Sequence, residues 1–207
     1  MDARLEKIFA KPNERTFRRR IPLAERAEAV GRERTIILAE AKAVRYWPEA
    51  DLAGNFVQQF RLDGFFDYHL ANRVLLHLAP VFQGKNICFW YGANDRTPTI
   101  VFKTAEKGVN FTEDPYDKSI EPAELFSLEF QLRSDPSHLR MNSLRSMQSG
   151  QAGRALAALY NLTRDLKLPR IEYSVLGSNH AAMRFYFHMD FGAPKDFECM
   201  DWVVEIE

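Results

Sequence analysis

The chain has 207 residues, 46% hydrophobic and 27% charged, which is enough apolar material for one globular domain with a buried core. Its formal net charge is zero, so no excess of one sign favours nucleic acid or an acidic membrane as a partner. Residues 1–10 lack the apolar stretch of a signal peptide, and the longest apolar run, 74–82, is too short to span a bilayer. We therefore expect a cytoplasmic protein with no nucleic-acid partner and no membrane span.

The N-terminal residues, 1–34, form a charged arm with ten Lys/Arg and six Asp/Glu. The rest of the chain, 35–207, is expected to form a single domain. Its β-branched start predicts a strand over 35–46. Apolar residues at helical spacing then predict one helix over 52–60 and a second over 65–78.

The spacing of the histidines and cysteines does not indicate a metal site. His69 and His77 lie eight residues apart on the second helix, whereas two histidines that bind one metal from a helix usually lie four apart. Cys88 and Cys199 form no CxxC pair, which fits a reducing compartment. We expect no metal cofactor.

The middle of the chain has strand character. Residues 87–91 and 99–102 predict two strands joined by a hairpin-like turn, and 104–124 is a long polar connection. A third strand over 125–133 alternates, with Phe126, Leu128, Phe130 and Leu132 on one face and Ser127, Glu129 and Gln131 on the other. The polar stretch 134–147 is interpreted as an insert.

The last quarter of the chain is the most specific. A glycine-containing loop, 148–153, leads into a helix that starts near Ala152 and closes near Leu166. A strand over 171–176 follows, then a helix from Ser178, its predicted N-cap, to about Met189, and a final strand over 200–206.

Two features of this region suit an extended, anionic ligand. A loop that enters a helix presents free backbone N–H groups and the positive end of the helix dipole, which favour a pyrophosphate. On the following helix, Asn179, Ala182 and Tyr186 are spaced i, i+3, i+7 and so share one face, with a small residue between two polar ones.

These two features together resemble the GCN5-related N-acetyltransferase superfamily. Its phosphate loop, Arg/Gln-x-x-Gly-x-Gly/Ala, is similar to Gln148, Ser149, Gly150, Gln151, Ala152 and Gly153 followed by Arg154. Its later motif, Asn, then Ala, then Tyr, then Gly-Phe, is similar to Asn179, Ala182, Tyr186 and Asp190-Phe191. The chain departs from the family at Gln151, where glycine is usual, and in the length of the segment 134–147.

The resemblance implies an α/β fold of the acyl-CoA N-acyltransferase type, with a mixed, mostly antiparallel sheet of about six strands and helices on both faces. It also implies transfer of an acetyl or other small acyl group from acetyl-CoA, the co-substrate, to an amine of an unidentified small molecule or protein. A homodimer is the default assembly.

Site roles follow from that resemblance. Tyr186 is expected to give a proton to the departing thiolate, and Asn179 to bind the pantetheine arm. Backbone N–H groups of the loop, with the Arg154 side chain, are expected to hold the phosphates, and N–H groups at the end of the strand 125–133 to polarise the carbonyl. For the base, the position of Glu129 on the polar face of the strand 125–133 makes it the first choice, with Glu172 as the second and a water relay as a third route.

Two alternatives remain open on the sequence. A long-chain N-acyltransferase, fed by acyl-CoA or an acyl carrier protein, would need Phe65, Phe66, Phe89 and Trp90 to line one apolar cavity. A non-catalytic binding or regulatory domain with the same fold is favoured by Gln151 and by the long segment 134–147.

Overall fold

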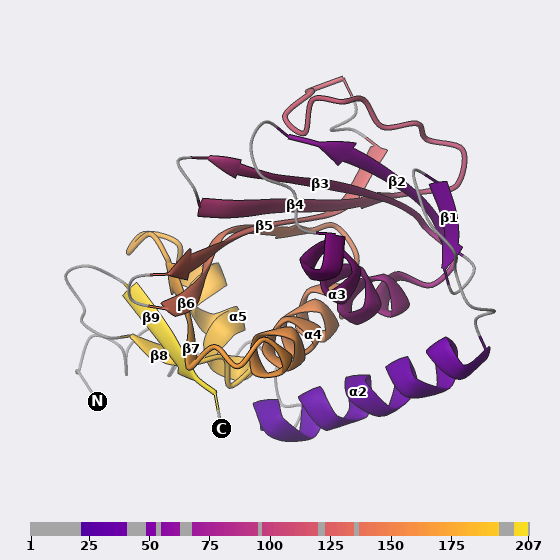
Figure 1. Cartoon of the computed structure of the whole chain (residues 1–207). Coiled ribbons are helices and arrows are strands. Elements are labelled where there is room, and N and C mark those ends of the chain that lie inside the picture. Colours follow the sequence, from indigo (N-terminus) through magenta and orange to yellow (C-terminus); the bar gives the residue numbers. More distant parts are fainter. Residues whose placement is uncertain are drawn as a thin grey trace.

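The computed structural model describes residues 22–40, 49–52, 55–62, 68–94, 97–119, 123–134, 137–194 and 201–206. These residues form one open sheet with helices packed beneath it in the view of Figure 1. The sheet has nine strands in the order β1-β2-β3-β4-β5-β6-β7-β9-β8. The two outermost strands are short, β1 with four residues and β8 with two, and the seven between them have at least five residues each.

The element bounds in chain order are α2 Leu23–Glu40, β1 Glu49–Leu52, β2 Asn55–Arg61, α3 Tyr68–Leu78, the 3₁₀ helix η2 Ala79–Phe82, β3 Asn86–Asn94, β4 Thr97–Ala105, β5 Glu124–Ser134, β6 Ser137–Ser146, α4 Gln151–Asp165, β7 Arg170–Ser174, α5 His180–His188, β8 Ala193–Pro194 and β9 Asp201–Glu205.

The strand pairing is mostly antiparallel. Only β2 with β3, and β6 with β7, run parallel among the described strands, and each of these pairs brackets a helix. A parallel pair needs such a crossover because the chain must return to the end at which the first strand started. The expectation of a mixed, mostly antiparallel α/β sheet is therefore confirmed, with nine strands rather than about six.

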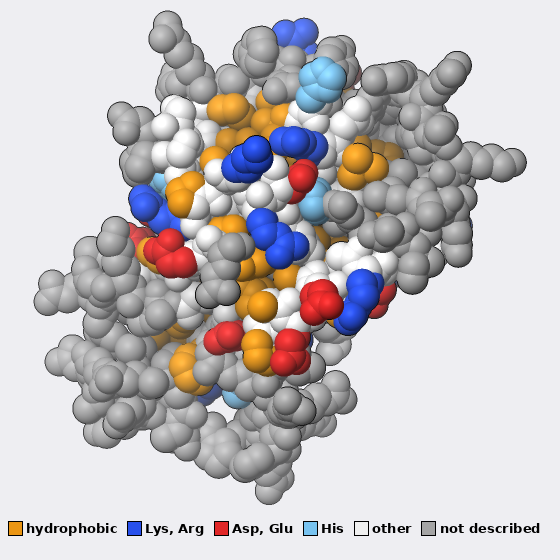
Figure 2. Space-filling model, turned by 60° about the horizontal axis from the view of Figure 1, so that its bottom comes forward, with side chains coloured by type: hydrophobic (Ala, Val, Ile, Leu, Met, Phe, Trp, Pro, Cys, Tyr) orange, Lys and Arg blue, Asp and Glu red, His pale blue; other side chains and the backbone are white. Residues whose placement is uncertain are grey.

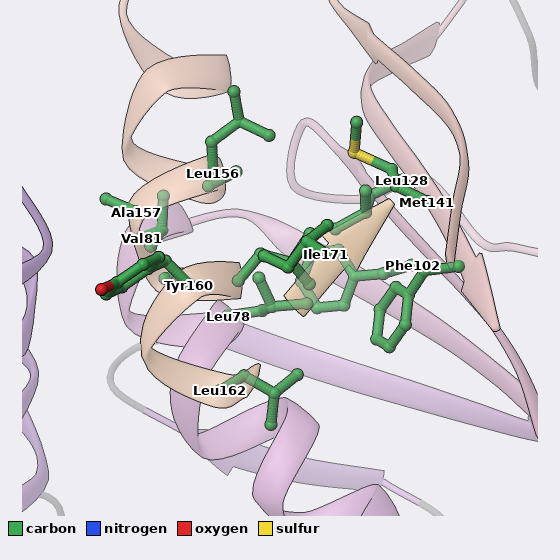
Figure 3. Packing of buried hydrophobic residues seen from close by; sticks show 14 of the residues in the cluster. Leu78, Val81, Phe102, Leu128, Met141, Leu156, Ala157, Tyr160, Leu162 and Ile171 are labelled. Atoms are coloured by element: carbon green, nitrogen blue, oxygen red, sulfur yellow. The ribbon is translucent and has the colours of Figure 1, made fainter. Parts of the chain in front are cut away.

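One large core lies between the sheet and the helices. The same sheet face carries Phe102, Leu128, Met141 and Ile171, which meet side chains of α3, η2 and α4 (Figure 3). Helix α5 joins the same core, because Tyr186 packs on Tyr173 of β7 with ring centroids 4.5 Å apart. The expectation of helices on both faces is wrong for the described helices, which all lie on this side of the sheet, with α2 packed on α4, η2 and α3 (Figure 1).

The opposite sheet face carries a smaller apolar cluster over β2 to β4. It consists of Cys88, Trp90, Val101, Ala105 and Phe111. The connection 106–119, not a helix, covers it: Phe111 packs edge-on against Trp90, whose indole N–H donates to the carbonyl of Thr112 at 3.2 Å. Toward β5, β6 and β7 this helix-free face becomes polar.

Three sequence predictions near the N-terminus are wrong. Residues 35–40, predicted as the start of a strand, continue helix α2, so the boundary placed between 34 and 35 falls inside a helix; residues 41–48 and the arm before Pro22 lie outside the described residues. The helix predicted over 52–60 is instead β1 and β2. Strand β2 is apolar on both faces, with Val57 in the large core and Phe60 against the smaller cluster, and this imitated helical spacing.

The segment 134–147, interpreted as an insert, is also different. Its residues Ser137–Ser146 form β6, which lies in the middle of the sheet between β5 and β7. The strand that leads into the glycine loop is therefore β6 and not the predicted strand 125–133, which is β5. Strands 87–91, 99–102, 125–133, 171–176 and 200–206 and helices 65–78, 152–166 and 178–189 are confirmed in type over their described residues; residues 65–67 and 200 lie outside those.

No described helix combines the length and the apolar character needed to cross a bilayer.

Candidate functional site

The parallel strands β6 and β7 pair over a short length and then separate. Leu139, Arg140 and Met141 pair with Ile171, Glu172 and Tyr173. Beyond Met141, β6 continues to Ser146, whereas β7 ends at Ser174. The pairing of β6 with β5 shifts register at the same level, because Ser143 faces Glu129 and Met141 faces Phe130, which leaves Asn142 as an extra residue. Such a bulge bends its strand away from a regular ladder.

A cleft of about 240 Å³ occupies the gap between the separating strands and the start of α5. The cleft is lined by Met141, Asn142, Ser143 and Leu144 of β6, Tyr173, Ser174, Val175 and Leu176 at the end of β7, and Asn179, Ala182 and Tyr186 of α5. The three residues singled out by their spacing, the N-cap Asn179 and Ala182 and Tyr186 of α5, thus do line one cleft together with the bulge residue Asn142.

Asn179 is the N-cap of α5. Its side-chain oxygen accepts the backbone N–H of Ala182 at 3.1 Å, so the helix starts one residue later than the predicted cap, Ser178, would place it. A capping side chain fixes one orphan donor of the first turn. The bond uses the amide oxygen, and the amide NH₂ group has two donors for other partners.

Tyr186 is held by aromatic neighbours at the floor of the cleft. Its side chain is 7% exposed, and its ring lies against Tyr173 at 4.5 Å and Trp202 at 6.3 Å between centroids. Burial raises the pKa of Tyr186 to about 12. The phenol therefore stays protonated through the neutral range and acts there as a hydrogen-bond donor.

The loop 148–153 lies where β6 leads into α4. Gly150 is the N-cap, with φ of 84° and no capping side chain. The first intrahelical bond runs from the N–H of Arg154 to the carbonyl of Gly150, at 3.3 Å. The N–H groups of Gln151, Ala152 and Gly153 precede that bond, so they lack helical acceptors and mark the positive end of the helix dipole.

Two loop residues have surroundings that the motif did not indicate. A Cβ atom on Gly153 would lie 2.7 Å from the Met189 Cε atom, so this glycine permits close packing of the Met189 side chain, at the end of α5, on the start of α4. The side-chain oxygen of Gln151 is buried without a protein partner. Gln148 and Ser149 complete the loop, and the Gln148 carbonyl accepts from the Ser146 hydroxyl at 2.9 Å.

Arg154, expected at the phosphates, forms an ion pair with Glu33 of α2. Both side chains are about half exposed, 47% and 53%. They border a groove of about 480 Å³ between α2 and α4, which Gly150 and Gly153 also line. Figure 2 shows the side of the molecule that carries α2, where acidic and basic side chains lie close together instead of forming patches of one sign.

Glu129 lies on the helix-free face of the sheet, whereas Tyr186 lies on the helix-covered face. Its carboxylate accepts from Asn142, the bulge residue, at 3.0 Å and from the hydroxyl of Tyr116. Partial burial and then this carboxylate raise the pKa of Tyr116. The structure therefore connects Glu129 to the cleft through Asn142 and places it opposite Tyr186.

Glu172, the second choice for a base, is already occupied. Its carboxylate accepts from Arg170 at 2.7 Å and lies 3.5 Å from His138 and 3.8 Å from Arg140. These contacts already engage the carboxylate within the protein, so it is a weaker candidate for the base. Glu172 instead links the paired parts of β6 and β7 through these contacts.

Sequence reasoning missed the cleft residues of β6, above all Asn142 and Ser143, because the whole segment was interpreted as an insert. The available signal was the alternation of His138, Arg140 and Ser143 with Leu139, Met141 and Leu144, interrupted once at the bulge. Among the described residues, no group of three or more His, Cys, Asp or Glu side chains is placed to hold a metal ion.

The apolar cavity that a long-chain acyl group would need is not formed by Phe89 and Trp90. Phe89 is buried in the large core and Trp90 in the cluster on the opposite face, so the two side chains do not line one tunnel. Phe65 and Phe66 lie outside the described residues.

A comparison with models of known protein families gives no match, and a search of curated proteins gives no significant match either.

Proposed function

We propose that the protein is an N-acyltransferase of the GCN5-related type, which moves an acetyl or other small acyl group from acyl-CoA directly to an amine. The observation that carries this proposal is the gap between β6 and β7, with a bulge on one wall and Asn179, Ala182 and Tyr186 on the other. A split parallel pair gives a thioester arm a path through the sheet, and the helix that follows β6 offers N–H groups to its pyrophosphate.

In this proposal the donor approaches from the start of α4. The free N–H groups of Gln151, Ala152 and Gly153 bind the pyrophosphate, and the pantetheine arm lies in the cleft beside the amide of Asn179. The carbonyl oxygen of the acyl group accepts from N–H groups at the bulge of β6, because the extra residue of a bulge leaves the regular ladder.

The acceptor amine reaches the carbonyl from the helix-free face. Its nitrogen forms a bond to the carbonyl carbon, the carbon–sulfur bond breaks, and CoA leaves as a thiolate. One amine proton passes to water or to Glu129. The Tyr186 hydroxyl donates a hydrogen bond to the developing thiolate; full proton transfer is uphill, because a thiol has a pKa of about 8.5 and burial raises that of Tyr186 to about 12.

The first test is calorimetric titration of the full chain with CoA, acetyl-CoA and a long-chain acyl-CoA. We expect the first two to bind. The variant Ser149→Glu adds a negative charge to an exposed loop residue and is expected to weaken binding by about tenfold or more.

Ser137→Glu is the matched control, because it adds the same charge at the exposed far end of β6 and should leave binding unchanged. Gly153→Asp is less suitable, since its Cβ would force the Met189 side chain to move and so change packing as well as charge. Absence of binding by CoA and by both thioesters would refute the acyl-CoA proposal and favour a carrier-protein donor or a non-catalytic domain. Preference for the long chain would favour a lipid substrate.

A further inference from the structure

The helix α2 lies across the phosphate end of the proposed donor site. It packs on α4 and borders the 480 Å³ groove together with the first turn of that helix. Glu33 of α2 is in ion-pair contact with Arg154, the first residue of α4 whose N–H is used within the helix. A carboxylate is therefore held beside a helix start whose N-cap residue, Gly150, has no side chain to cap the free N–H groups.

Buried contacts near its start hold helix α2 on the rest of the protein. Its first half is anchored by burial of Leu23, Ala27 and Val30, and by a buried hydrogen bond from the Asn161 side chain to the carbonyl of Ala27 at 2.7 Å. The Glu33 side chain lies beyond these anchors and is half exposed, so its contact with Arg154 can open without breaking the buried part of the helix.

We propose that Glu33 gates the donor site: its carboxylate occupies the Arg154 guanidinium, and an anionic donor must displace it in order to bind. This inference rests on the proposed function, because it assigns a regulation to the same phosphate site. The N-terminal helix α2 thereby sets how tightly the protein holds its donor.

The physical basis is competition for one guanidinium and repulsion between like charges. The Nη2 group of Arg154 donates to the Glu33 carboxylate, and a phosphate that engages the same edge of the guanidinium must displace that carboxylate. A bound pyrophosphate would also lie near the Glu33 carboxylate and be repelled by it. Removing the charge of Glu33 frees Arg154 and removes the repulsion, whereas removing Arg154 takes away the group for which the two anions compete.

The test compares four proteins by isothermal titration with CoA and, separately, with inorganic pyrophosphate: wild type, Glu33→Gln, Arg154→Gln and the double variant. Because an exposed ion pair contributes little, we expect Glu33→Gln to tighten both ligands by about two- to fivefold. Arg154→Gln should weaken both, and Glu33→Gln should lose most of its effect in the double variant. Added salt should reduce the difference between wild type and Glu33→Gln.

Glu28→Gln is the matched control. Glu28 lies on the same helix and pairs with Arg32 at 3.1 Å, so this variant makes the same change in charge without freeing Arg154. We expect its dissociation constants to stay closer to wild type than those of Glu33→Gln. An equal effect of the two substitutions would reduce the gate to general charge repulsion and overturn it, as would unchanged or weaker binding by Glu33→Gln.

The gate and the proposed function fail in different ways. If wild type binds CoA and Glu33→Gln binds it no more tightly, the gate is refuted. The acyltransferase proposal is unaffected by that result. If wild type binds neither probe, the proposed donor fails, and the gate is then decided by Glu33→Gln: binding gained by this variant supports it, and no binding refutes it.

Discussion

The sheet contains two parallel strand pairs, each with a helix between its strands, and the two pairs differ at the end where the first strand leads into its helix. Strands β2 and β3 stay paired from Phe56 to Arg61 on β2, six consecutive residues, and the backbone of Leu62 still donates to Tyr91 at 2.8 Å. Strands β6 and β7 pair over three residues and then separate. The same local arrangement gives a closed pair in one place and a cleft in the other.

Packing explains why the first pair stays closed. Val57 of β2 is buried in the large core, while Phe60 stacks on Trp90 at 5.8 Å on the opposite face. Both faces of this pair are therefore sealed by apolar contacts. In the second pair, Asn142 bulges out of β6, and β7 ends before its neighbour. The difference indicates that a bulge in one strand, together with the early end of its neighbour, can separate two paired strands.

The largest expected effect concerns the pair that stays closed, β2 and β3, and the helices between its strands. Phe82 of η2 is fully buried and lies 4.5 Å from Phe126 between ring centroids. We expect Phe82→Ala to lower the free energy of unfolding by about 3–5 kcal/mol, because it removes a large aromatic side chain from the core. Chemical denaturation checks the value. A change below about 1 kcal/mol would mean that this end of the core is loosely packed.

The next largest effect tests the chemistry at the cleft between β6 and β7. Tyr186→Phe keeps the ring that packs on Tyr173 but removes the hydroxyl. We expect kcat for acyl transfer to fall by about 10²-fold, with CoA affinity nearly unchanged. Steady-state kinetics and calorimetry on the same samples separate the two quantities. An unchanged kcat would remove Tyr186 from the mechanism.

An alanine-to-leucine substitution should have opposite effects on stability and on CoA binding when it is made beside the closed pair and when it is made at the cleft. Ala71 of α3 is fully buried, so Ala71→Leu overpacks the core next to the closed pair. It should lower the free energy of unfolding by about 1–3 kcal/mol. Ala182 of α5 lines the cleft, where a leucine side chain has room. Ala182→Leu should therefore leave stability nearly unchanged and weaken CoA binding by about tenfold. Loss of stability with intact CoA binding at position 182 would show that the cleft is not the donor site.

The smallest effect concerns alkaline pH. The pKa of Tyr186 in the folded protein, about 12, lies above the ordinary tyrosine value of 10.0. Between these values the unfolded chain loses the proton first, so this contribution to stability is present below pH 10 and is lost as the pH rises toward 12. Burial also raises the pKa of Tyr173, which acts in the same direction. The denaturation midpoint of wild type should fall relative to that of Tyr186→Phe as the pH rises from about 9, one unit below the ordinary tyrosine value, toward about 12; parallel curves would contradict the shift.

The amino-acid sequence by itself determined the local elements of the candidate site. Helix α4, strand β7 and helix α5 were predicted in type and nearly in extent, because helical or alternating spacing, Pro169 and Gly177 act within a few residues of one another. The face shared by Asn179, Ala182 and Tyr186 follows from the same local geometry, and these residues do meet at one cleft.

Only the tertiary structure decided which segments surround them. Strand β6 is polar because Arg140 is satisfied by Ser174 at 2.5 Å and lies 3.6 Å from Asp201, on strands far along the chain, so its own sequence gave little sign of a central strand. The helical layer on one face, the contact of α2 with Arg154 and the position of Glu129 opposite Tyr186 likewise depend on partners distant in sequence. Local spacing fixes the face a residue takes within its element, whereas packing between elements fixes what that face meets.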